Sequence, residues 1–260
     1  MILLDIQDIS WMKLFASYSL LLIPFGALWA YKTGLLKDTL IGVLRMTLQL
    51  FLVGLYLEFL FTLNSWYINI LWVLIMIAIA GFTVINRAAL NFRLYAIPVF
   101  LSLFSCLIII DVFFLGFTIA LDNIFDARYL IPITGMLIGN SIERNILALN
   151  HFNKSLKENS GFYKYSIANG AKRSEAVQPF IKEALRISFN PFIAQMAIIG
   201  LISLPGAMTG QILGGSSPNV AIKYQIMLML SIFVLTTSTV VLSMVLSKRF
   251  VIDEFDNPRV

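Results

Sequence analysis

The apolar residues of this 260-residue chain fall in long runs, separated by shorter polar stretches. A helix that crosses a bilayer core of about 30 Å needs about 20 mostly apolar residues, and several runs approach that length. The pattern therefore predicts an all-α integral membrane protein with about seven transmembrane helices. Pro24 is expected to kink the first of them. The expected spans are residues 11–30, 40–61, 66–85, 96–120, 129–149, 191–213 and 221–246.

Composition supports this class and narrows the function. Hydrophobic residues make up 59% of the chain and charged residues only 13%, against about 25% charged residues in a typical soluble domain. A single cysteine, Cys106, excludes an intrachain disulfide. The net charge of +5 is explained by basic loops of a membrane protein, so no nucleic-acid partner is expected. Nor does the chain carry a P-loop motif for nucleotide binding.

The basic residues of the loops set an orientation, because Lys and Arg concentrate on the cytoplasmic side of a membrane. With seven spans, the basic loops all fall on one side, which puts the N-terminus outside and the C-terminus inside. The residues concerned are Lys32, Lys37, Arg87, Arg93, Lys154, Lys157, Lys164, Lys172, Arg173, Lys182, Arg186, Lys248 and Arg249.

A polar, basic stretch at about residues 150–190 interrupts the spans. Residues 162–169 fit a short helix, and Gly170 suits the left-handed position that ends one. Ser174 is a plausible N-cap for a following amphipathic helix. The apolar stripe of that helix comprises Val177, Phe180, Ile181, Ala184 and Leu185. Two interpretations remain open, a hairpin packed on the membrane boundary and a docking element for a partner.

Ionisable and polar residues inside a membrane are costly and often functional. Asp111 lies deep in the fourth span and is expected to pair across helices or to face a polar cavity. The fifth span carries Asn140, Ser141 and Glu143, which either line a transport path or join helices together. Glu143 is not expected to neutralise its neighbour Arg144, because adjacent helical positions point about 100° apart.

Two further features concern backbone packing. Gly135 and Gly139 form a small-xxx-small pattern, for which helix packing is the favoured interpretation. Leu204-Pro205-Gly206 interrupts the sixth span, and broken backbone at membrane depth is tolerated where protein or a water-filled cavity satisfies it. The sixth span is therefore expected to bend at Pro205 and to place Met208, Thr209 and Gln211 beside the path, although a kink that serves only packing stays possible.

Two motifs resemble those of a known family. Ala168-Asn169-Gly170-Ala171, followed by the Ser174-Glu175-Ala176 helix, is similar to the cytoplasmic coupling loop of ABC transporter permeases. The run LISLPGAMTGQILGGSSPNVAIKYQIMLM at residues 201–229 resembles the signature of bacterial iron-export ABC permeases, which have plant relatives associated with aluminium tolerance. Gly135–Asn140 fits the same family, whereas the Glu-Ala-Ala of importer permeases has no match at Lys164-Tyr165-Ser166.

The resemblance implies that residues 1–260 form one transmembrane domain, the permease subunit of an ATP-driven exporter, with iron as the expected substrate. It implies a permease homodimer in a prokaryotic inner membrane and a separate ABC ATPase that binds ATP and Mg, so this chain needs no cofactor and is not itself an enzyme. The metal ligands are not identified, since His151 is the only histidine. The expected ATPase-coupling residues are Tyr165, Ile167, Ala168, Asn169, Gly170 and Ala171.

Two alternatives belong to other classes. One is an ion-coupled secondary transporter or channel that uses Asp111 and Glu143 as a proton relay. The other is a membrane scaffold that transports nothing. The expected translocation path, for the exporter, comprises Asp111, Asn140, Ser141, Glu143, Pro205, Met208, Thr209 and Gln211.

Overall fold

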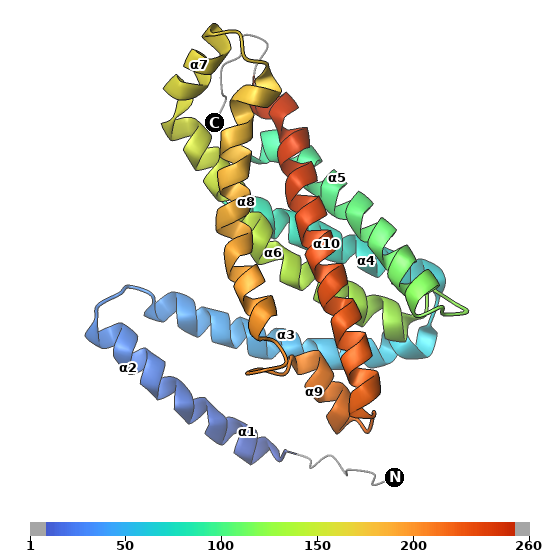
Figure 1. Ribbon diagram of the computed structural model, residues 1–260. Coiled ribbons are helices and arrows are strands. Elements are labelled where there is room, and N and C mark those ends of the chain that lie inside the picture. The colour runs from blue at the N-terminus through green and yellow to red at the C-terminus, as the bar shows by residue number, and fades with distance from the viewer. Residues whose placement is uncertain (1–8, 253–260) are drawn as a thin grey trace. The chain divides into compact units, whose positions relative to one another are not determined.

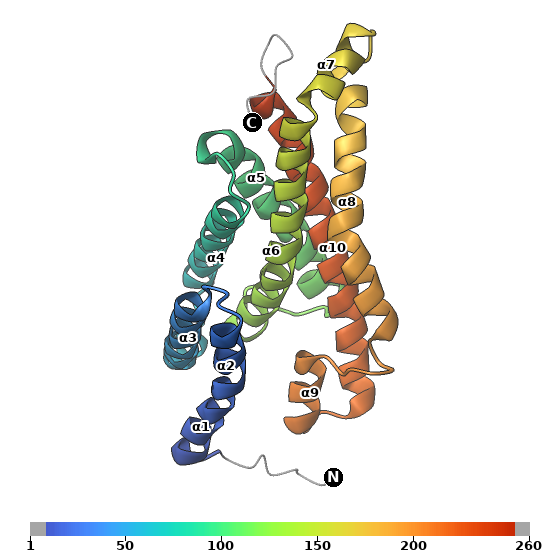
Figure 2. The ribbon, with the colours of Figure 1, turned by 90° about the vertical axis from the view of Figure 1, so that its left-hand side faces the viewer.

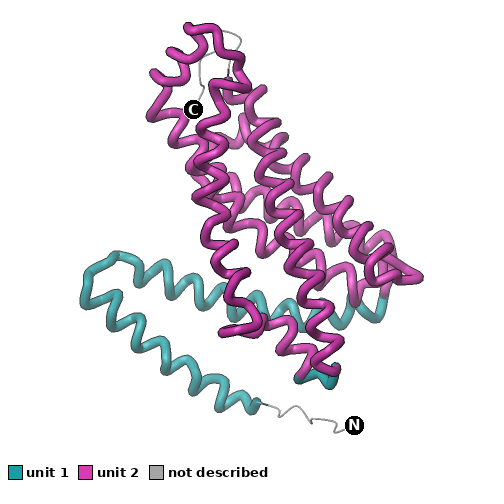
Figure 3. The backbone as a smooth tube through the Cα atoms, viewed as in Figure 1, with its two compact units in different colours: residues 1–63, 213–216 teal, residues 64–212, 217–260 magenta. Residues whose placement is uncertain are grey.

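The computed structural model describes residues 9–252, and these residues are helical with no β-strand among them, as the sequence predicts. They divide into two compact units, shown in Figure 3. Unit 1 comprises residues 1–63 and 213–216, and unit 2 comprises residues 64–212 and 217–260.

Unit 1 is built from two apolar helical segments. The first runs through α1 (Trp11–Ser17), a 3-10 turn η1 (Tyr18–Leu21) and α2 (Leu22–Ala30), and the second is α3 (Leu36–Leu63). The 3-10 turn ends at Leu21, three residues before Pro24, whose missing backbone N–H would otherwise donate to the Leu20 carbonyl of that turn. A hydrogen bond of 2.6 Å joins the Tyr18 hydroxyl to the Thr47 hydroxyl, so the two segments are tied near their middles.

Unit 2 contains the remaining helices. They are α4 (Trp66–Arg87), α5 (Phe92–Asp111), the π-helix η2 (Val112–Thr118), α6 (Ala127–Glu158), α7 (Ser160–Ala168), α8 (Arg173–Ile198), α9 (Gly206–Leu213) and α10 (Pro218–Val251), with the last residue of α9 in unit 1. Helix α6 packs against α4, α8 and α10, and α5 packs against α4 and α10 (Figures 1 and 2). Helix α6 is therefore at the centre of the apolar core of unit 2.

Five segments of the described chain are long and apolar enough to cross a bilayer. They are Trp11–Ala30, Leu36–Leu63, Trp66–Arg87, Phe92–Thr118 and Pro218–Val251. The expected spans at 129–149 and 191–213 are not among them. Helix α6 carries polar residues along its second half, and the first half of α8 is the polar, basic segment. The chain is thus a multi-pass helical membrane protein, and the count of seven stays a prediction.

The expected sixth span is wrong as a single bent helix. Helix α8 runs without interruption from the polar segment to Ile198, and the chain then leaves helical geometry until α9 begins at Gly206. Gly200 has a φ of +88°, and its N–H donates to the Ser203 carbonyl in a tight turn. Pro205 therefore precedes a new helix instead of kinking an old one. With 8 residues, α9 is about 12 Å long, too short to span a bilayer.

Close packing between α4 and α5 depends on one glycine. A Cβ atom added to Gly81 would lie 2.5 Å from the Phe100 ring, closer than any real contact. Gly81 is buried, so no other residue fits there without displacing the Phe100 ring. Nothing in the apolar pattern of the sequence distinguishes this glycine from the others.

Candidate functional site: the polar face of helix α6

Helix α6 carries a series of polar side chains that reach the neighbouring helices. Near its start, the Thr134 hydroxyl donates a hydrogen bond of 2.8 Å to Oδ2 of Asp111 on α5. Farther along, Asn145 Nδ2 donates to the Thr239 hydroxyl of α10 at 3.0 Å. Thr134, Asn145 and Thr239 are all buried. These residues join α6 to α5 and α10 inside the core, which is the helix-joining role that membrane interiors favour for such groups.

At the end of α6, two more bonds connect it to the start of α5. Asn150 Nδ2 donates to the Ala88 carbonyl, and the Tyr95 hydroxyl donates to Oδ1 of Asn153, both at 3.0 Å. The turn between α4 and α5 thus lies at the same end of unit 2 as the end of α6. The basic residues Arg87 and Arg93 border that turn, so they share an end with the basic segment that follows α6.

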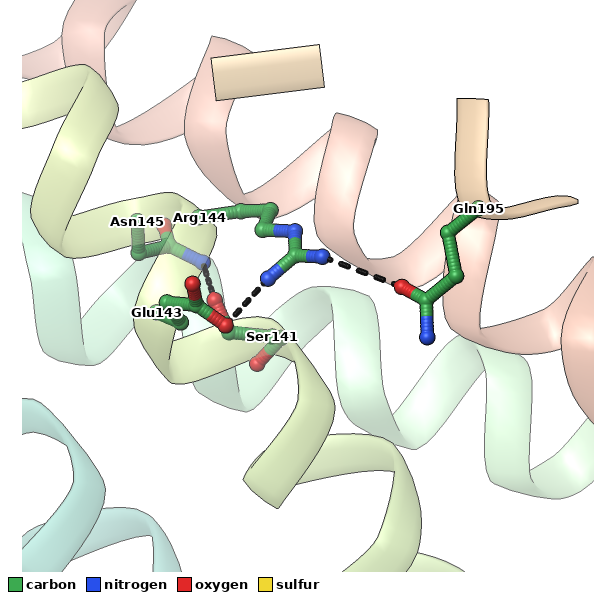
Figure 4. Close-up of polar contacts among 5 residues, drawn as sticks. All are labelled: Ser141, Glu143, Arg144, Asn145 and Gln195. Atoms are coloured by element: carbon green, nitrogen blue, oxygen red, sulfur yellow. Dashed lines mark hydrogen bonds and ion pairs between the residues drawn. The ribbon is translucent and has the colours of Figure 1, made fainter. Parts of the chain in front are cut away.

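Arg144 is the centre of a polar cluster between α6 and α8, drawn in Figure 4. Its guanidinium forms an ion pair with the Glu143 carboxylate and donates a hydrogen bond of 3.4 Å to Oε1 of Gln195. It also lies over the Phe192 ring, 5.2 Å from the ring centroid, a geometry in which the ring attracts a cation. Arg144 therefore attaches to α8 through both a polar and an aromatic contact.

The ion pair corrects the expectation that Glu143 and Arg144 do not neutralise each other. The Cβ atoms of adjacent helical residues point in different directions, but both side chains are long enough to bend toward each other and bring their charged ends together. The Arg144 side chain is only 12% exposed, whereas that of Glu143 is 71% exposed. Glu143 is thus available to a partner or solute while it balances the charge of a mostly covered arginine.

The expected path residues on α6 lie on two different sides. Ser141 is buried and donates to the Ile138 carbonyl of its own helix. Asn140 is exposed and donates to the Met136 carbonyl, and Glu143 lies one turn farther along the same exposed side. The structure therefore brings Asn140 and Glu143 together on a surface of unit 2 and separates Ser141 from them.

The two glycines of α6 differ in the same way. A Cβ on Gly135 would meet Met76 of α4 at 3.3 Å, so the packing role expected for Gly135 is confirmed. A Cβ on Gly139 would meet nothing within 4 Å among the described atoms, so Gly139 packs no helix within the described chain. Gly139 instead adjoins Asn140 on the exposed side, where it leaves the helix backbone uncovered.

Asp111 occupies a separate site. It is 7% exposed and pairs across helices with Thr134, as expected, but its cavity is apolar rather than polar. Thr134 and Glu143 lie about 13 Å apart along α6 at 1.5 Å per residue. Asp111 therefore does not join Glu143 in one group.

The residues expected around the sixth-span break form a group of their own. Met208 is buried, Pro205 and Gln211 are half-buried and Thr209 is exposed. The Thr209 hydroxyl donates to the Pro205 carbonyl at 3.2 Å. Within residues 9–252, no hydrogen bond connects this group with α6. The structure does not bring these residues together with Asn140 and Glu143.

The turn between α7 and α8 has the geometry expected of it. Gly170 has a φ of +88°, the Gly170 N–H donates to the Ile167 carbonyl, and the Ala171 N–H donates to the Ser166 carbonyl. These two bonds define a Schellman motif, in which glycine is favoured at the left-handed position. Helix α8 then begins one residue before the expected cap Ser174, because Glu175 accepts from the Lys172 N–H.

Side chains on either side of the turn fix it to the core. Tyr163 of α7 is fully buried, and the Phe162 ring meets the Phe180 ring edge-on at 6.4 Å. The expected apolar stripe of α8 is confirmed, with Val177, Phe180 and Ala184 buried and Ile181 and Leu185 partly buried. Tyr165, Ala168, Asn169 and Gly170 remain exposed, while Ile167 and Ala171 pack partly against the core.

Comparison with known proteins gives the family. Residues 11–252 match the uncharacterised protein family UPF0014. The chain belongs to the UPF0014 family. No solved structure is detectably similar to it.

Relatives of this UPF0014 chain include bacterial and plant proteins. The membrane protein YjkA of Bacillus subtilis is 31% identical over 219 residues, 84% of this chain and 86% of its own length. ALUMINUM SENSITIVE 3 of Arabidopsis thaliana is 35% identical over 195 residues, covering 74% of this chain and 69% of its own length. The probable iron export permease protein FetB of Escherichia coli is 29% identical over 229 residues, 88% and 85% of the two chains. The resemblance to iron-export permeases and plant aluminium-tolerance proteins is confirmed.

Some residues that contact α6 in this UPF0014 chain could not be identified from the sequence. Gln195 and Phe192 lie more than forty positions after Arg144 and meet it only because α8 packs against α6. Thr239 is one of several small polar residues in an apolar run and gives no signal of its own. Arg144 itself gives a signal, since an arginine inside a span requires a partner. That signal indicates a partner without identifying it.

Proposed function

We propose that this UPF0014 chain is the membrane-spanning permease subunit of an ATP-driven exporter in a prokaryotic inner membrane. A separate ABC ATPase, which holds ATP and Mg, supplies the energy, and two permease chains assemble with the ATPases. The observation that carries the proposal is the α7–α8 turn. It presents exposed residues on a backbone held by the Schellman motif at Gly170, and the residues flanking it are anchored in the core.

A docking surface needs both exposure and stiffness, because a loose loop would absorb a movement instead of transmitting it. Tyr165, Ala168 and Asn169 supply the exposed surface. Tyr163 and the Phe162–Phe180 contact supply the stiffness. Seven basic residues around the turn are exposed, as expected of a segment on the cytoplasmic side. They are Lys154, Lys157, Lys164, Lys172, Arg173, Lys182 and Arg186.

The translocation path is proposed to follow the exposed side of α6. Asn140 offers an amide and Glu143 a carboxylate, and Gly139 leaves room for a solute beside them. Residues of α9 (Met208, Thr209 and Gln211) and Pro205 stay part of the proposed path. Asp111 and Ser141 lie away from the exposed side, where Asp111 accepts from Thr134 and Ser141 donates to the Ile138 carbonyl within α6. Binding of ATP draws the ATPases together and moves the α7–α8 turn, and the helices then expose the path alternately to the two sides.

Iron is proposed as the substrate because a relative of similar length is named a probable iron export permease. Carboxylate and amide oxygens such as those of Glu143 and Asn140 are acceptable to Fe(II) as ligands. Residues 9–252 contain no group of three His, Cys, Asp or Glu side chains able to hold a metal ion. The iron is therefore expected to pass through weakly bound, with ligands contributed by both copies of the chain.

The test is reconstitution of the chain in proteoliposomes with an ABC ATPase from the same organism. The expected result is ATP hydrolysis that iron(II) stimulates and ATP-dependent movement of iron(II) across the bilayer, with other divalent metals tested in parallel. Ala168→Glu places a bulky charge on the exposed turn and should reduce the coupled transport at least about tenfold, a loss of about 1.4 kcal/mol in coupling. Basal ATPase activity should persist.

Gly161→Ala is the matched control. Gly161 lies on the same short helix, and a Cβ there would meet nothing within 4 Å, so transport should be unchanged. Full coupling in the Ala168→Glu protein would refute docking at this turn. Iron flux driven by a proton gradient without any ATPase would favour the ion-coupled transporter instead. Within residues 9–252, Asp111 bonds to Thr134 and Glu143 pairs with Arg144, so no direct hydrogen bond joins the two carboxyl groups that this alternative uses.

A further inference from the structure

Unit 2 also contains an apolar cavity beside Asp111 that the proposed export path does not use. Its volume is about 330 Å³, and it lies between α4, the α5–η2 segment and the beginning of α6. Pockets that hold small molecules begin at about 300 Å³ and combine apolar walls with a few polar groups. Its lining includes Val73, Leu74, Ile108, Asp111, Val112 and Leu115, and the remaining lining residues are apolar.

Asp111 is the one ionisable side chain in this lining. Its Oδ2 accepts the hydrogen bond from Thr134, but its Oδ1 is buried and has no hydrogen-bond partner among residues 9–252. A buried oxygen without a partner costs free energy in any apolar setting. A carboxylate in such a place is stabilised by a ligand that donates a hydrogen bond or carries a positive charge.

The backbone next to Asp111 departs from α-helical geometry at residues that line the cavity. Helix α5 ends at Asp111, and the π-helix η2 begins at Val112. Val112 and Leu115 of η2 both line the cavity. Single π-helical turns are rare and often occur at functional sites. The irregular backbone widens the helix where the cavity and the carboxylate meet.

The chemistry of the cavity selects one class of occupant. A metal ion requires several oxygen, nitrogen or sulfur ligands, and this cavity offers one carboxylate among apolar walls. A neutral hydrocarbon would fill the walls and leave Oδ1 unpaired. Leu74, Ile108 and Val112 are lining residues that remain exposed on unit 2, so the entrance is apolar as well. A ligand that satisfies all of these conditions is an apolar molecule with a single amine.

We propose that this cavity binds a lipid-soluble amine, whose apolar body fills the space between α4 and the α5–η2 segment and whose protonated nitrogen pairs with Asp111. The ammonium donates to Oδ1, while Thr134 continues to donate to Oδ2. The entrance admits the molecule from the apolar phase. The site is separate from Asn140 and Glu143, so it does not depend on the export function proposed above.

The test measures binding of two probes of nearly the same shape, phenylbutylamine and phenylbutanol, to the purified chain in lipid nanodiscs by titration calorimetry. Empty nanodiscs provide the correction for partition into lipid. The amine should bind at least about tenfold more tightly than the alcohol, because an ionised hydrogen bond is stronger than a neutral one.

Three variants locate the binding. Asp111→Asn keeps an acceptor for Thr134 but removes the charge, so amine and alcohol should bind equally. Val73→Phe fills the cavity from α4, so both probes should lose saturable binding. Asp122→Asn, on an exposed carboxylate outside the lining, should behave as the wild type.

Equal binding of the two probes to the wild type would overturn the proposal and would describe a cavity for lipid chains only. So would a preference for the amine that survives Asp111→Asn or Val73→Phe. If the Asp111→Asn chain does not fold, the Val73→Phe chain and the ratio of the two wild-type affinities still decide the outcome.

Discussion

The two sides of α6 carry polar residues of the same kinds in opposite surroundings. On the buried side, Thr134 and Asn145 bond to Asp111 of α5 and Thr239 of α10. On the exposed side, and among residues 9–252, Asn140 and Glu143 bond only within α6, to the Met136 carbonyl and to Arg144. The first pair holds the helix in the core, whereas the second pair is free to meet a solute or a partner. Residue type alone therefore does not reveal which polar residues of a membrane helix serve function.

The largest difference between the buried and the exposed side of α6 is expected when a glycine on each side is replaced by leucine. Gly135→Leu should destabilise the chain by about 1–3 kcal/mol, because even a Cβ there lies 3.3 Å from the Met76 methyl group of α4 and a longer side chain would press against it. Gly139→Leu should leave stability unchanged, since a Cβ there meets nothing within 4 Å, yet it should block export along the exposed side. Unfolding in detergent and iron flux in proteoliposomes measure the two effects.

A large loss of stability in the Gly139→Leu protein would contradict the division, because it would show that this side is packed in the folded chain.

The next largest difference is expected between the two asparagines. Asn145→Leu removes the bond to Thr239 and should destabilise the chain by about 1 kcal/mol, the size of a typical interhelical hydrogen bond in a membrane. Asn140→Leu removes only a bond to its own helix, so its stability should stay near that of the wild type while its transport rate falls. The same unfolding and flux measurements apply. Equal losses of stability would show that both asparagines join helices.

The smallest effect concerns the attachment of α6 to α8. Arg144→Lys keeps a positive charge beside Glu143 but loses the planar group that spans Gln195 and the Phe192 ring. Stability should fall by about 0.5–1 kcal/mol. A double-mutant cycle with Gln195→Ala separates the hydrogen bond from the ring contact. Additive losses in that cycle would mean that the bond of 3.4 Å contributes nothing.

Local sequence patterns predicted the features that depend on neighbouring residues. The left-handed turn at Gly170 and the apolar stripe of α8 follow from one helix end and one helical period, and both are confirmed. The need of Asp111 for a partner on another helix follows from the cost of burying a carboxylate, and Thr134 meets it.

Features that depend on distant residues could not be predicted in the same way. The identity of Gln195 as the partner of Arg144 requires knowledge of how α6 and α8 pack. The apolar run at 191–213 gave no sign that the helix stops at Ile198, because apolar residues continue through the non-helical stretch. The role of Gly81 depends on the position of one ring on another helix.

The continuity of α8 has a mechanical consequence. Its 26 residues extend for about 39 Å, from the turn at Gly170 to the non-helical stretch that follows Ile198. A displacement of one end of this helix is therefore expected to move the other end with it. Two prolines, Pro179 and Pro191, lie inside this helix, and neither can donate a backbone hydrogen bond to the preceding turn. Phe192 follows Pro191 in the sequence, and its ring contacts the Arg144 guanidinium of α6. The contacts of Arg144 with Phe192 and Gln195 hold α8 against α6 just beyond Pro191, so we expect them to limit bending of α8 at that proline.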